Sequence, residues 1–340
     1  MIAADADGAI AQPGVTRVPA PPGLFYAGGA PDALERGGGG ARAAAFTARL
    51  TAAVARRAAR WDAVVAHWLA PSALAALPSR GPMLAIAHGG DVHLLARRRL
   101  LVPTVAALAA RRARVTFVSD ELAARTRAAL PAPLARWLDD AACVQPMGVD
   151  LARFAAIADA RATAPPPPRP RLLVLARLVP IKGVDVVLDA LSHLRAPVDL
   201  VIAGDGPHAE ELRRRAASHV GAHAVHWRGA IDADARDAEL ARASLVVVPS
   251  RALPSGRAEG HPMVAAEALA AGVPLVVTRT GGLAGLGPPV VHAAPDDPAD
   301  LARAIDRALA RPAAAADLRA LAAPVDWRVV EARLRGHGRL

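Results

Sequence analysis

Short apolar runs alternate with helical patterns through the second half of the chain, and this alternation limits the fold more than any other feature. Six runs rich in Val, Leu and Ile are predicted as strands: residues 171–176, 198–203, 224–227, 245–248, 274–277 and 290–292. Helical patterns are predicted at 182–194, 207–218 and 262–271. Strands that are apolar throughout are buried on both faces, so the alternation predicts a doubly wound parallel sheet.

The first half of the chain shows the same alternation after its first forty residues. Strands are predicted at 63–66, 83–87, 115–118 and 143–145, and an alanine-rich helix at 41–60. Residues 1–40 are rich in glycine and proline and show no convincing strand followed by a phosphate-binding loop. The run Gly37–Gly40 is therefore interpreted as a flexible loop.

A proline-rich run, Ala164–Pro170, separates the two halves. It cannot lie inside a helix and would hold two domains apart. We therefore predict an N-terminal domain at 1–165, a C-terminal domain at 166–325 and a tail helix at 326–340.

Composition excludes several classes of protein. With 53% hydrophobic residues the chain can bury a large core, which argues against disorder. The net charge of +10 suggests a polyanion partner, but aromatic residues total 3% and the arginines are scattered, so no nucleic acid is expected. Of the 41 basic residues only Lys182 is a lysine. This bias is typical of a GC-rich genome, so most of the arginines carry little functional information.

The single cysteine, Cys143, excludes an intrachain disulfide, and no Cys/His cluster has the spacing of a zinc site, so no metal is expected. These features favour a cytoplasmic location. No run reaches the roughly 18 apolar residues of a membrane span. Peripheral contact with a membrane stays open.

The first charged motif is RLVPIKG at residues 177–183. A buried strand is predicted to end at Ala176, the turn presents Arg177, and Lys182 opens a helix. Two cations at the end of a parallel strand favour an anion site. The alternative is a pair of solvated surface charges, which would not explain why the one lysine of the chain stands here.

The second motif is EGHPMVAAE at residues 259–267. Pro262 suits the first position of a helix, whose free amides would point to the same edge of the sheet. Glu259 lies on the loop before this helix, and Glu267 stands in an alanine-rich stretch that would pack on the sheet. A buried carboxylate needs a partner, for example the hydroxyls of a polyol. The alternative for Glu267 is an ordinary solvated helix residue.

Together these motifs resemble the donor-binding domain of the family-4 retaining glycosyltransferases. The resemblance runs through residues 171–285 and rests on RLVPIKG, on AGDGP at 203–207 and on the Glu-x7-Glu spacing of Glu259 and Glu267. In the first half VVAHWLAP, AHGGDV, FVSDELA and MGVDLARF match in the same order. The resemblance implies the α/β fold called GT-B, in which two Rossmann-like doubly wound domains face each other across a cleft.

The resemblance also implies a role for each matching residue. Arg177 and Lys182 would bind the donor diphosphate and neutralise the leaving nucleoside diphosphate, so no metal or other cofactor is expected. Glu267 would accept hydrogen bonds from the ribose, and Glu259 would hold the donor sugar. The other implied donor-binding residues are Gly204 and Arg228, near the base, and Gly260, His261, Pro262, Met263 and Val264, although the family usually has an apolar residue at the position of His261.

His88 follows the predicted strand 83–87 and matches the histidine with which the family's first domain approaches the donor sugar. The alternative is a structural histidine at a strand end. Asp91 and His93 are weaker candidates for the same wall. His67 and Trp68 are assigned to the acceptor side.

One departure from the family concerns the N-terminal domain. In the family a strand, a glycine-rich loop, a helix and a second strand precede the segment that residues 14–23 resemble. The resemblance therefore implies an incomplete domain that lacks the first β-loop-α unit. Either the start codon lies upstream, which we favour, or the protein is shortened and impaired.

The predicted function is transfer of a sugar from a nucleotide-diphosphate sugar to a hydroxyl, with the anomeric configuration retained. The acceptor could be a saccharide, a lipid-linked molecule or a small molecule. Two alternatives stay open: an epimerase or phosphorylase of the same fold, and a non-catalytic or impaired protein that binds nucleotide sugars. The motifs do not specify the base or sugar of the donor.

Overall fold

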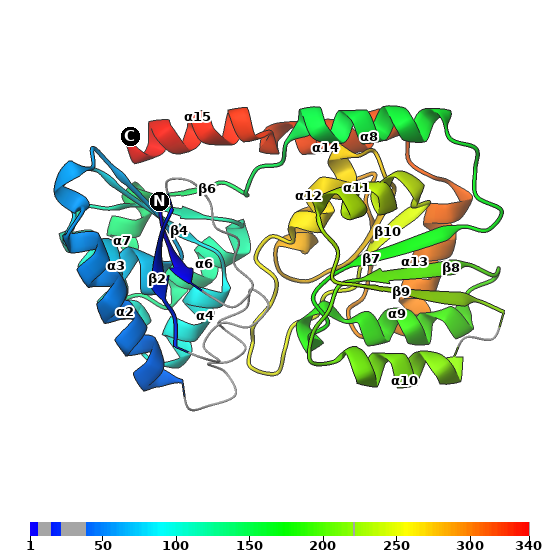
Figure 1. Ribbon diagram of the computed structural model, residues 1–340, viewed down its shortest axis with the longest axis horizontal. Coiled ribbons are helices and arrows are strands. Elements are labelled where there is room, and N and C mark those ends of the chain that lie inside the picture. The colour runs from blue at the N-terminus through cyan, green and yellow to red at the C-terminus, as the bar shows by residue number, and fades with distance from the viewer. Residues whose placement is uncertain (6–14, 22–38, 220–221, 340) are drawn as a thin grey trace. The chain divides into compact units, whose positions relative to one another are not determined.

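The computed structural model describes residues 1–5, 15–21, 39–219 and 222–339 (Figure 1). The chain divides into two compact units. Unit 1 comprises Met1–Gln145 and Glu331–Leu340, and unit 2 comprises Pro146–Val330. Among the described residues, no helix combines the length and the apolar character needed to cross a bilayer.

Unit 2 is built on a parallel sheet with the strand order β12-β11-β10-β7-β8-β9 (Figure 1). Its strands are β7 (Arg171–Leu175), β8 (Asp199–Ala203), β9 (Ala224–Gly229), β10 (Leu245–Val248), β11 (Leu275–Thr278) and β12 (Val291–Ala293). The chain starts at the centre with β7, runs outward through β8 and β9, and returns to the other side of β7 at β10. Open α/β sheets bind ligands outside the carboxyl ends of their strands at such a switch point. The loops after β7 and β10 are therefore the place to look for a site.

Helices cover both faces of this sheet. On one face lie α9 (Val184–Ala190), α10 (Ala209–His219) and α13 (Pro298–Ala310). On the other lie α8 (Leu151–Thr163), α11 (Ala233–Arg242), α12 (Met263–Ala270) and α14 (Ala315–Ala322). Adjacent residues of β7 alternate between the two cores: Leu172 and Val174 pack with the first set and Leu173 with the second. All residues of β10 and β11 are buried, which explains their uninterrupted apolar runs.

Unit 1 contains a four-stranded parallel sheet in the order β3-β4-β5-β6 and a two-stranded parallel sheet of β1 and β2. The strands are β1 (Ile2–Asp5), β2 (Thr16–Pro19), β3 (Val64–His67), β4 (Met83–Ala87), β5 (Arg114–Phe117) and β6 (Ala142–Val144). The α-helices are α2 (Gly40–Ala55), α3 (Leu74–Ala76), α4 (Gly90–Arg97), α5 (Leu101–Ala110), α6 (Asp120–Ala128) and α7 (Ala132–Ala141). The last helix, α15 (Trp327–Gly338), belongs to unit 1 from Glu331 onward, where His337 Nε2 donates to the Val115 carbonyl at 3.0 Å.

The predicted strands are confirmed in both units. The predictions for 83–87 and 245–248 coincide with β4 and β10, and the others differ from the observed strands only at their ends. The elements that the sequence did not predict include α11 and, within residues 1–40, β1 and β2. Of the predicted Gly37–Gly40 loop, Gly37 and Gly38 lie outside the described residues, Gly39 caps α2 and Gly40 begins it.

The proline-rich run lies inside unit 2, so the observed division at Gln145 and Pro146 differs from the predicted boundary at 165. The reason is the packing of α8, which precedes the prolines. Phe154 and Ile157 of this helix enter the same core as Leu173 of β7. The prolines therefore connect α8 to β7 within one unit.

Candidate active site

The loops after β7 and β10 touch at the switch point of unit 2. The first ends in a 3-10 turn, Pro180–Lys182, followed by Gly183 with a φ of 60°. A β-carbon on Gly183 would collide with the carbonyl of Pro249, which directly follows β10. The Arg251 amide also donates to the Ile181 carbonyl at 2.9 Å. Glycine permits this close approach, which fixes the lysine of the first loop beside the second loop.

Lys182 and Glu259, which the sequence predicted from separate motifs, form an ion pair. Lys182 Nζ lies 2.9 Å from Glu259 Oε2, and the two side chains are only 16% and 14% exposed. At this depth each charge depends on the other, because removing one leaves the second buried without compensation. Arg177 stands on the same loop as the lysine, shortly after β7. The structure thus brings the lone lysine and a predicted sugar-binding carboxylate together at the switch point.

The loop that carries Glu259 is anchored on the loop after β11. The Gly282 amide donates to the Glu259 carbonyl at 3.0 Å, and a β-carbon on Gly281 would collide with the same oxygen. Gly260 and His261 continue this loop to α12. The sequence predicted Pro262 at the first position of α12. In the structure Pro262 is instead the N-cap residue, and Met263 and Val264 lie in the first turn.

The imidazole of His261 carries a buried ring nitrogen that no described residue satisfies. Its Nε2 is buried and has no hydrogen-bond partner among the described residues. Burial lowers the pKa of His261 to about 4. The ring is therefore neutral at pH 7 and adds no charge to the loop.

Glu267 lies on α12 and contacts a cation from α11. Arg236 Nη1 donates to Glu267 Oε1 at 2.8 Å, and the glutamate side chain is 15% exposed. Burial raises the pKa of Glu267, and the positive charge of Arg236 offsets part of this effect. The sequence predicted that this carboxylate needs a polar partner. It did not identify Arg236, because α11 was not predicted.

The loop after β8 lies against the loop after β7. Gly204 has a φ of 144°, and a β-carbon there would collide with the Ala176 carbonyl. Its amide donates to the Gly229 carbonyl at 2.7 Å. The guanidinium of Arg228 pairs instead with the buried Glu239 of α11 at 2.9 Å. Gly204 therefore lets the loops after β7 and β8 pack closely, and the side chain of Arg228, which the sequence placed near the base, has a structural partner.

In unit 1 the loop after β4 is organised by Asp91. This carboxylate is 1% exposed and accepts hydrogen bonds from the amides of Leu69, His88 and Gly89 at 2.6, 3.1 and 3.0 Å. Burial raises the pKa of Asp91, and these backbone hydrogen bonds oppose the shift. The observed role of Asp91, which the sequence placed on the wall of the donor site, is to hold the backbone of His88.

His88 and His67 form a hydrogen-bonded pair in unit 1. His88 Nε2 lies 3.0 Å from His67 Nδ1, with the two rings stacked. Trp68 also stacks on His88, with ring centroids 6.1 Å apart. Burial, and then the neighbouring His67, lower the pKa of His88 to about 4, while burial lowers that of His67. Both rings are therefore neutral at pH 7, and one ring nitrogen donates to the other.

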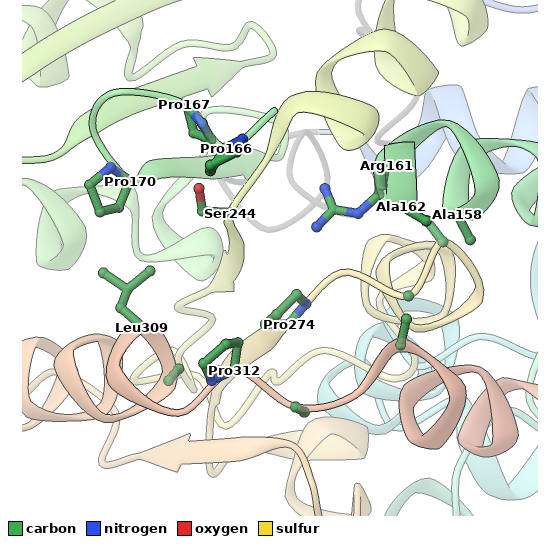
Figure 2. Close-up of a pocket in the computed structure, with 15 residues that line it drawn as sticks. Ala158, Arg161, Ala162, Pro166, Pro167, Pro170, Ser244, Pro274, Leu309 and Pro312 are labelled. Atoms are coloured by element: carbon green, nitrogen blue, oxygen red, sulfur yellow. The ribbon is translucent and has the colours of Figure 1, made fainter. Parts of the chain in front are cut away.

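The cavity in Figure 2 lies at the opposite edge of the unit 2 sheet and encloses about 520 Å³. Its lining includes Pro170, Ser244 and Pro274, which directly precede β7, β10 and β11. The one ionisable residue that lines it, Arg161, donates through Nη1 to carbonyls at the end of α11. None of the predicted site residues lines this cavity, so it is separate from the switch point.

The described part of the chain contains no group of three or more His, Cys, Asp or Glu residues that could hold a metal ion. At the switch point Lys182 and Glu259 form their ion pair, and Arg177 stands on the same loop as the lysine. The chemistry of the two cations suits an anion with several oxygens.

Comparison with known proteins places the chain among glycosyltransferases. Residues 169–311 match the family of glycosyl transferases group 1. A D-inositol 3-phosphate glycosyltransferase of Xylanimonas cellulosilytica is 30% identical over 298 residues, which cover 80% of this chain and 67% of that protein. A GDP-mannose-dependent alpha-(1-6)-phosphatidylinositol monomannoside mannosyltransferase of Mycobacterium tuberculosis is 38% identical over 177 residues. That match covers 49% of this chain and 44% of the mannosyltransferase, so the chain spans less than half the length of this relative.

A solved structure shows the same arrangement of elements over most of the chain. HepE (Alr3699) of Anabaena, crystallised in complex with UDP and glucose, matches with a TM-score of 0.70. The match covers 95% of this chain and 85% of HepE at 19% sequence identity. This likeness concerns the fold alone and confirms the predicted pair of Rossmann-like domains.

Proposed function

The chain belongs to the group 1 glycosyl transferases and has the GT-B fold, and on this premise we propose that it moves a sugar from a nucleoside-diphosphate sugar to an acceptor hydroxyl. The observation that carries the proposal is the position of Lys182. The one lysine of the chain lies at the switch point of a Rossmann-like sheet, where such sheets bind nucleotides. A compact ammonium suits a phosphate group there.

Lys182 and Arg177 neutralise the negative charge that develops on the leaving nucleoside diphosphate. Electrostatic stabilisation of this kind is often the largest contribution to catalysis. In the free protein Glu259 balances the charge of Lys182, so the lysine is held in place before the donor arrives. When the donor binds, the ammonium is shared with phosphate oxygens and Glu259 turns to the hydroxyls of the donor sugar. These two cations supply the charge, and the proposal needs no metal.

The nucleoside occupies the carboxyl edge of the sheet. Glu267 accepts hydrogen bonds from the ribose hydroxyls, and the backbone near Gly204 and Gly229 lies beside the base. Gly260, His261 and the first turn of α12 hold the donor sugar together with Glu259. Because His261 is neutral, its contribution is a hydrogen bond or a packing contact and not a charge.

His88 contributes a neutral imidazole from unit 1. With its pKa lowered to about 4, it serves as a hydrogen-bonding group for a sugar hydroxyl and not as a proton donor at pH 7. Asp91 fixes the backbone that presents it. Retention of configuration follows the family-4 resemblance: the acceptor attacks the face from which the diphosphate leaves, and no protein nucleophile takes part.

The named relatives guide the choice of substrates. The mycobacterial protein is GDP-mannose-dependent and HepE was crystallised with UDP and glucose, so GDP-mannose and UDP-glucose are the donors to test first. The names of the Xylanimonas and mycobacterial relatives point to inositol phosphate and phosphatidylinositol mannoside as acceptors to test, one from the small-molecule class and one from the lipid-linked class. We place the reaction in the cytoplasm, where nucleotide sugars are available, with peripheral membrane contact if the acceptor is a lipid.

The test is release of nucleoside diphosphate from each donor, with and without acceptor, by the wild type, Lys182→Met and Glu267→Gln. Turnover that depends on acceptor is expected, with a loss of about a hundred- to thousandfold in Lys182→Met. Arg303→Met, which breaks an exposed pair with Asp300, is the control and should match the wild type. Wild-type rates in Lys182→Met would refute the assignment.

The same assay separates the alternatives. Conversion of the donor sugar without acceptor indicates an epimerase, and turnover that requires inorganic phosphate indicates a phosphorylase. Binding of donor without any turnover indicates a non-catalytic protein. Where a product forms, NMR coupling constants at the new anomeric carbon report whether configuration is retained, and activity in excess chelator tests the proposal that no metal is needed.

A further inference from the structure

Arg236 of α11 bonds two carboxylates beside the predicted site. Its Nη1 donates to Glu267 Oε1 at 2.8 Å, while Nε and Nη2 donate to Asp237 Oδ1 at 2.9 and 2.8 Å. The face of the guanidinium lies over the ring of Phe154 on α8, 5.3 Å from the ring centroid. The edge and the face of this group are therefore both engaged, which leaves it little freedom to turn.

The second carboxylate in this cluster is itself held from another helix. Arg153 Nε donates to Asp237 Oδ2, and Arg153 Nη2 to Asp234 Oδ1 at 3.2 Å. Phe154 and Arg153 both lie in the segment MGVDLARF, which the proposed function leaves without a role. This segment joins α8 to α11, and α11 in turn holds the glutamate of α12.

The partners of Glu267 are distributed unequally between its two oxygens. Oε1 accepts from Arg236, whereas Oε2 has no hydrogen-bond partner among the described residues. A carboxylate with one oxygen anchored and one available presents a fixed acceptor to a ligand hydroxyl. We infer that Arg236 is a positioning residue that holds Glu267 ionised and oriented, with Oε2 directed to the ribose of the donor. This inference rests on the proposed function, in which Glu267 binds that ribose.

The pKa of Glu267 responds to charged groups on two neighbouring helices. Three charged groups act on its carboxyl, and they come from the two helices that pack beside it: Arg236 and Asp237 of α11 and Arg153 of α8. The strands β10 and β11 under α12 carry no ionisable side chain, and those of α14, Asp317 and Arg319, are exposed. Burial and Asp237 raise the pKa of Glu267, while Arg236 is the larger of the two effects that lower it.

The sign of the pH effect follows from this balance. Loss of Arg236 raises the pKa of Glu267 further, so the carboxyl takes up a proton at a higher pH than in the wild type. A protonated carboxyl accepts hydrogen bonds less well. The affinity for a ribose-bearing ligand should therefore decline earlier on acidification when Arg236 is removed.

The experiment is calorimetric titration of UDP and of GDP into the wild type, Arg236→Met, Arg153→Met and Glu267→Gln, between about pH 5.5 and pH 8.5. The affinity of each variant is divided by that of the wild type at the same pH, which cancels the titration of the phosphate. Arg153→Met is the matched control, since it removes a guanidinium bonded to Asp237 but not to Glu267. Thermal unfolding of each variant reports whether the fold persists.

We expect Arg236→Met to bind the diphosphates more weakly than the wild type, with the deficit largest at the acidic end of the range and smallest at the alkaline end, because loss of Arg236 raises the pKa of Glu267. Arg153→Met should show a smaller effect in the same direction, because Arg153 lowers the pKa of Glu267 only through its charge and makes no hydrogen bond to it. Equal or tighter binding by Arg236→Met, or a uniform loss with the wild-type pH profile, overturns the positioning role. Wild-type affinity in Glu267→Gln instead refutes the ribose contact of the proposed function, so the two failures are distinguishable.

Discussion

Replacement of Lys182 by methionine tests the ion pair at the switch point by removing the charge and keeping most of the side-chain length. Glu259 would then be a carboxylate that is 14% exposed and without its cation. Removing one partner of a buried pair costs about 3–5 kcal/mol. Since both side chains keep some contact with water, we expect about 2–3 kcal/mol here.

The assay is a double-mutant cycle in the free energy of unfolding, with Lys182→Met, Glu259→Gln and the double variant. Differential scanning calorimetry should show that the Tm of unit 2 is lower by about 5–10 °C in Lys182→Met than in the wild type. The double variant should recover much of this loss, which gives a coupling energy of about 2 kcal/mol.

Arg303→Met is the control for this cycle, because it breaks an ion pair of similar type whose arginine is 60% exposed. Its effect should stay below about 0.5 kcal/mol. A coupling energy near zero between Lys182 and Glu259, or equal effects of Lys182→Met and Arg303→Met, would refute the argument that the lysine is held by Glu259 before substrate binds.

Three further predictions concern single residues. Gly204→Ala should destabilise unit 2 by more than about 2 kcal/mol, because the new β-carbon meets the Ala176 carbonyl at a positive φ; thermal unfolding measures this, and a neutral effect would contradict the close approach of the two loops. His88 has a pKa of about 4 in the folded protein, below the 6.5 of an ordinary imidazole, so the unfolded chain takes up a proton first as the pH falls. The free energy of unfolding of the wild type should therefore fall between about pH 6.5 and pH 4, and that of His88→Gln should fall less. The same dependence of unfolding on pH in the two proteins would contradict the lowered pKa of His88. Asp91→Asn should destabilise unit 1 by about 2 kcal/mol, since an amide cannot accept from three backbone amides as a carboxylate does; denaturant titration checks this, and an unchanged midpoint would show that the aspartate does not anchor the loop.

The sheets could be predicted because several of their strands are buried on both faces. A fully buried parallel strand must be apolar at each position, and β4, β10 and β11 are buried throughout, so the runs stand out in the sequence. The helix α11 could not be found in the same way. Its sequence, ADARDAELAR, is polar, and only Glu239 and Leu240 are buried, so it has no apolar stripe.

The cations that pair with the two predicted carboxylates could not be identified from the sequence, in part because α11 was not predicted. The spacing of Glu259 and Glu267 points to both carboxylates, but their cations lie far away in the chain, on the loop after β7 and on α11. Pairing at such separation depends on the packing of the helices and has no local signal. The domain boundary was predicted at the proline-rich run for a similar reason. A stiff local sequence does not reveal that Phe154, which precedes the prolines, packs in the core of unit 2.

The most direct test of the account is whether a diphosphate binds at Lys182. Calorimetric titration should compare UDP and GDP with uridine and guanosine, for the wild type and for Lys182→Met. We predict that at least one diphosphate binds the wild type, that its nucleoside binds far more weakly, and that Lys182→Met loses about a hundredfold or more of the diphosphate affinity. Equal binding of that diphosphate by the wild type and Lys182→Met, or no binding of either diphosphate, would contradict the claim that the one lysine of the chain marks the donor site.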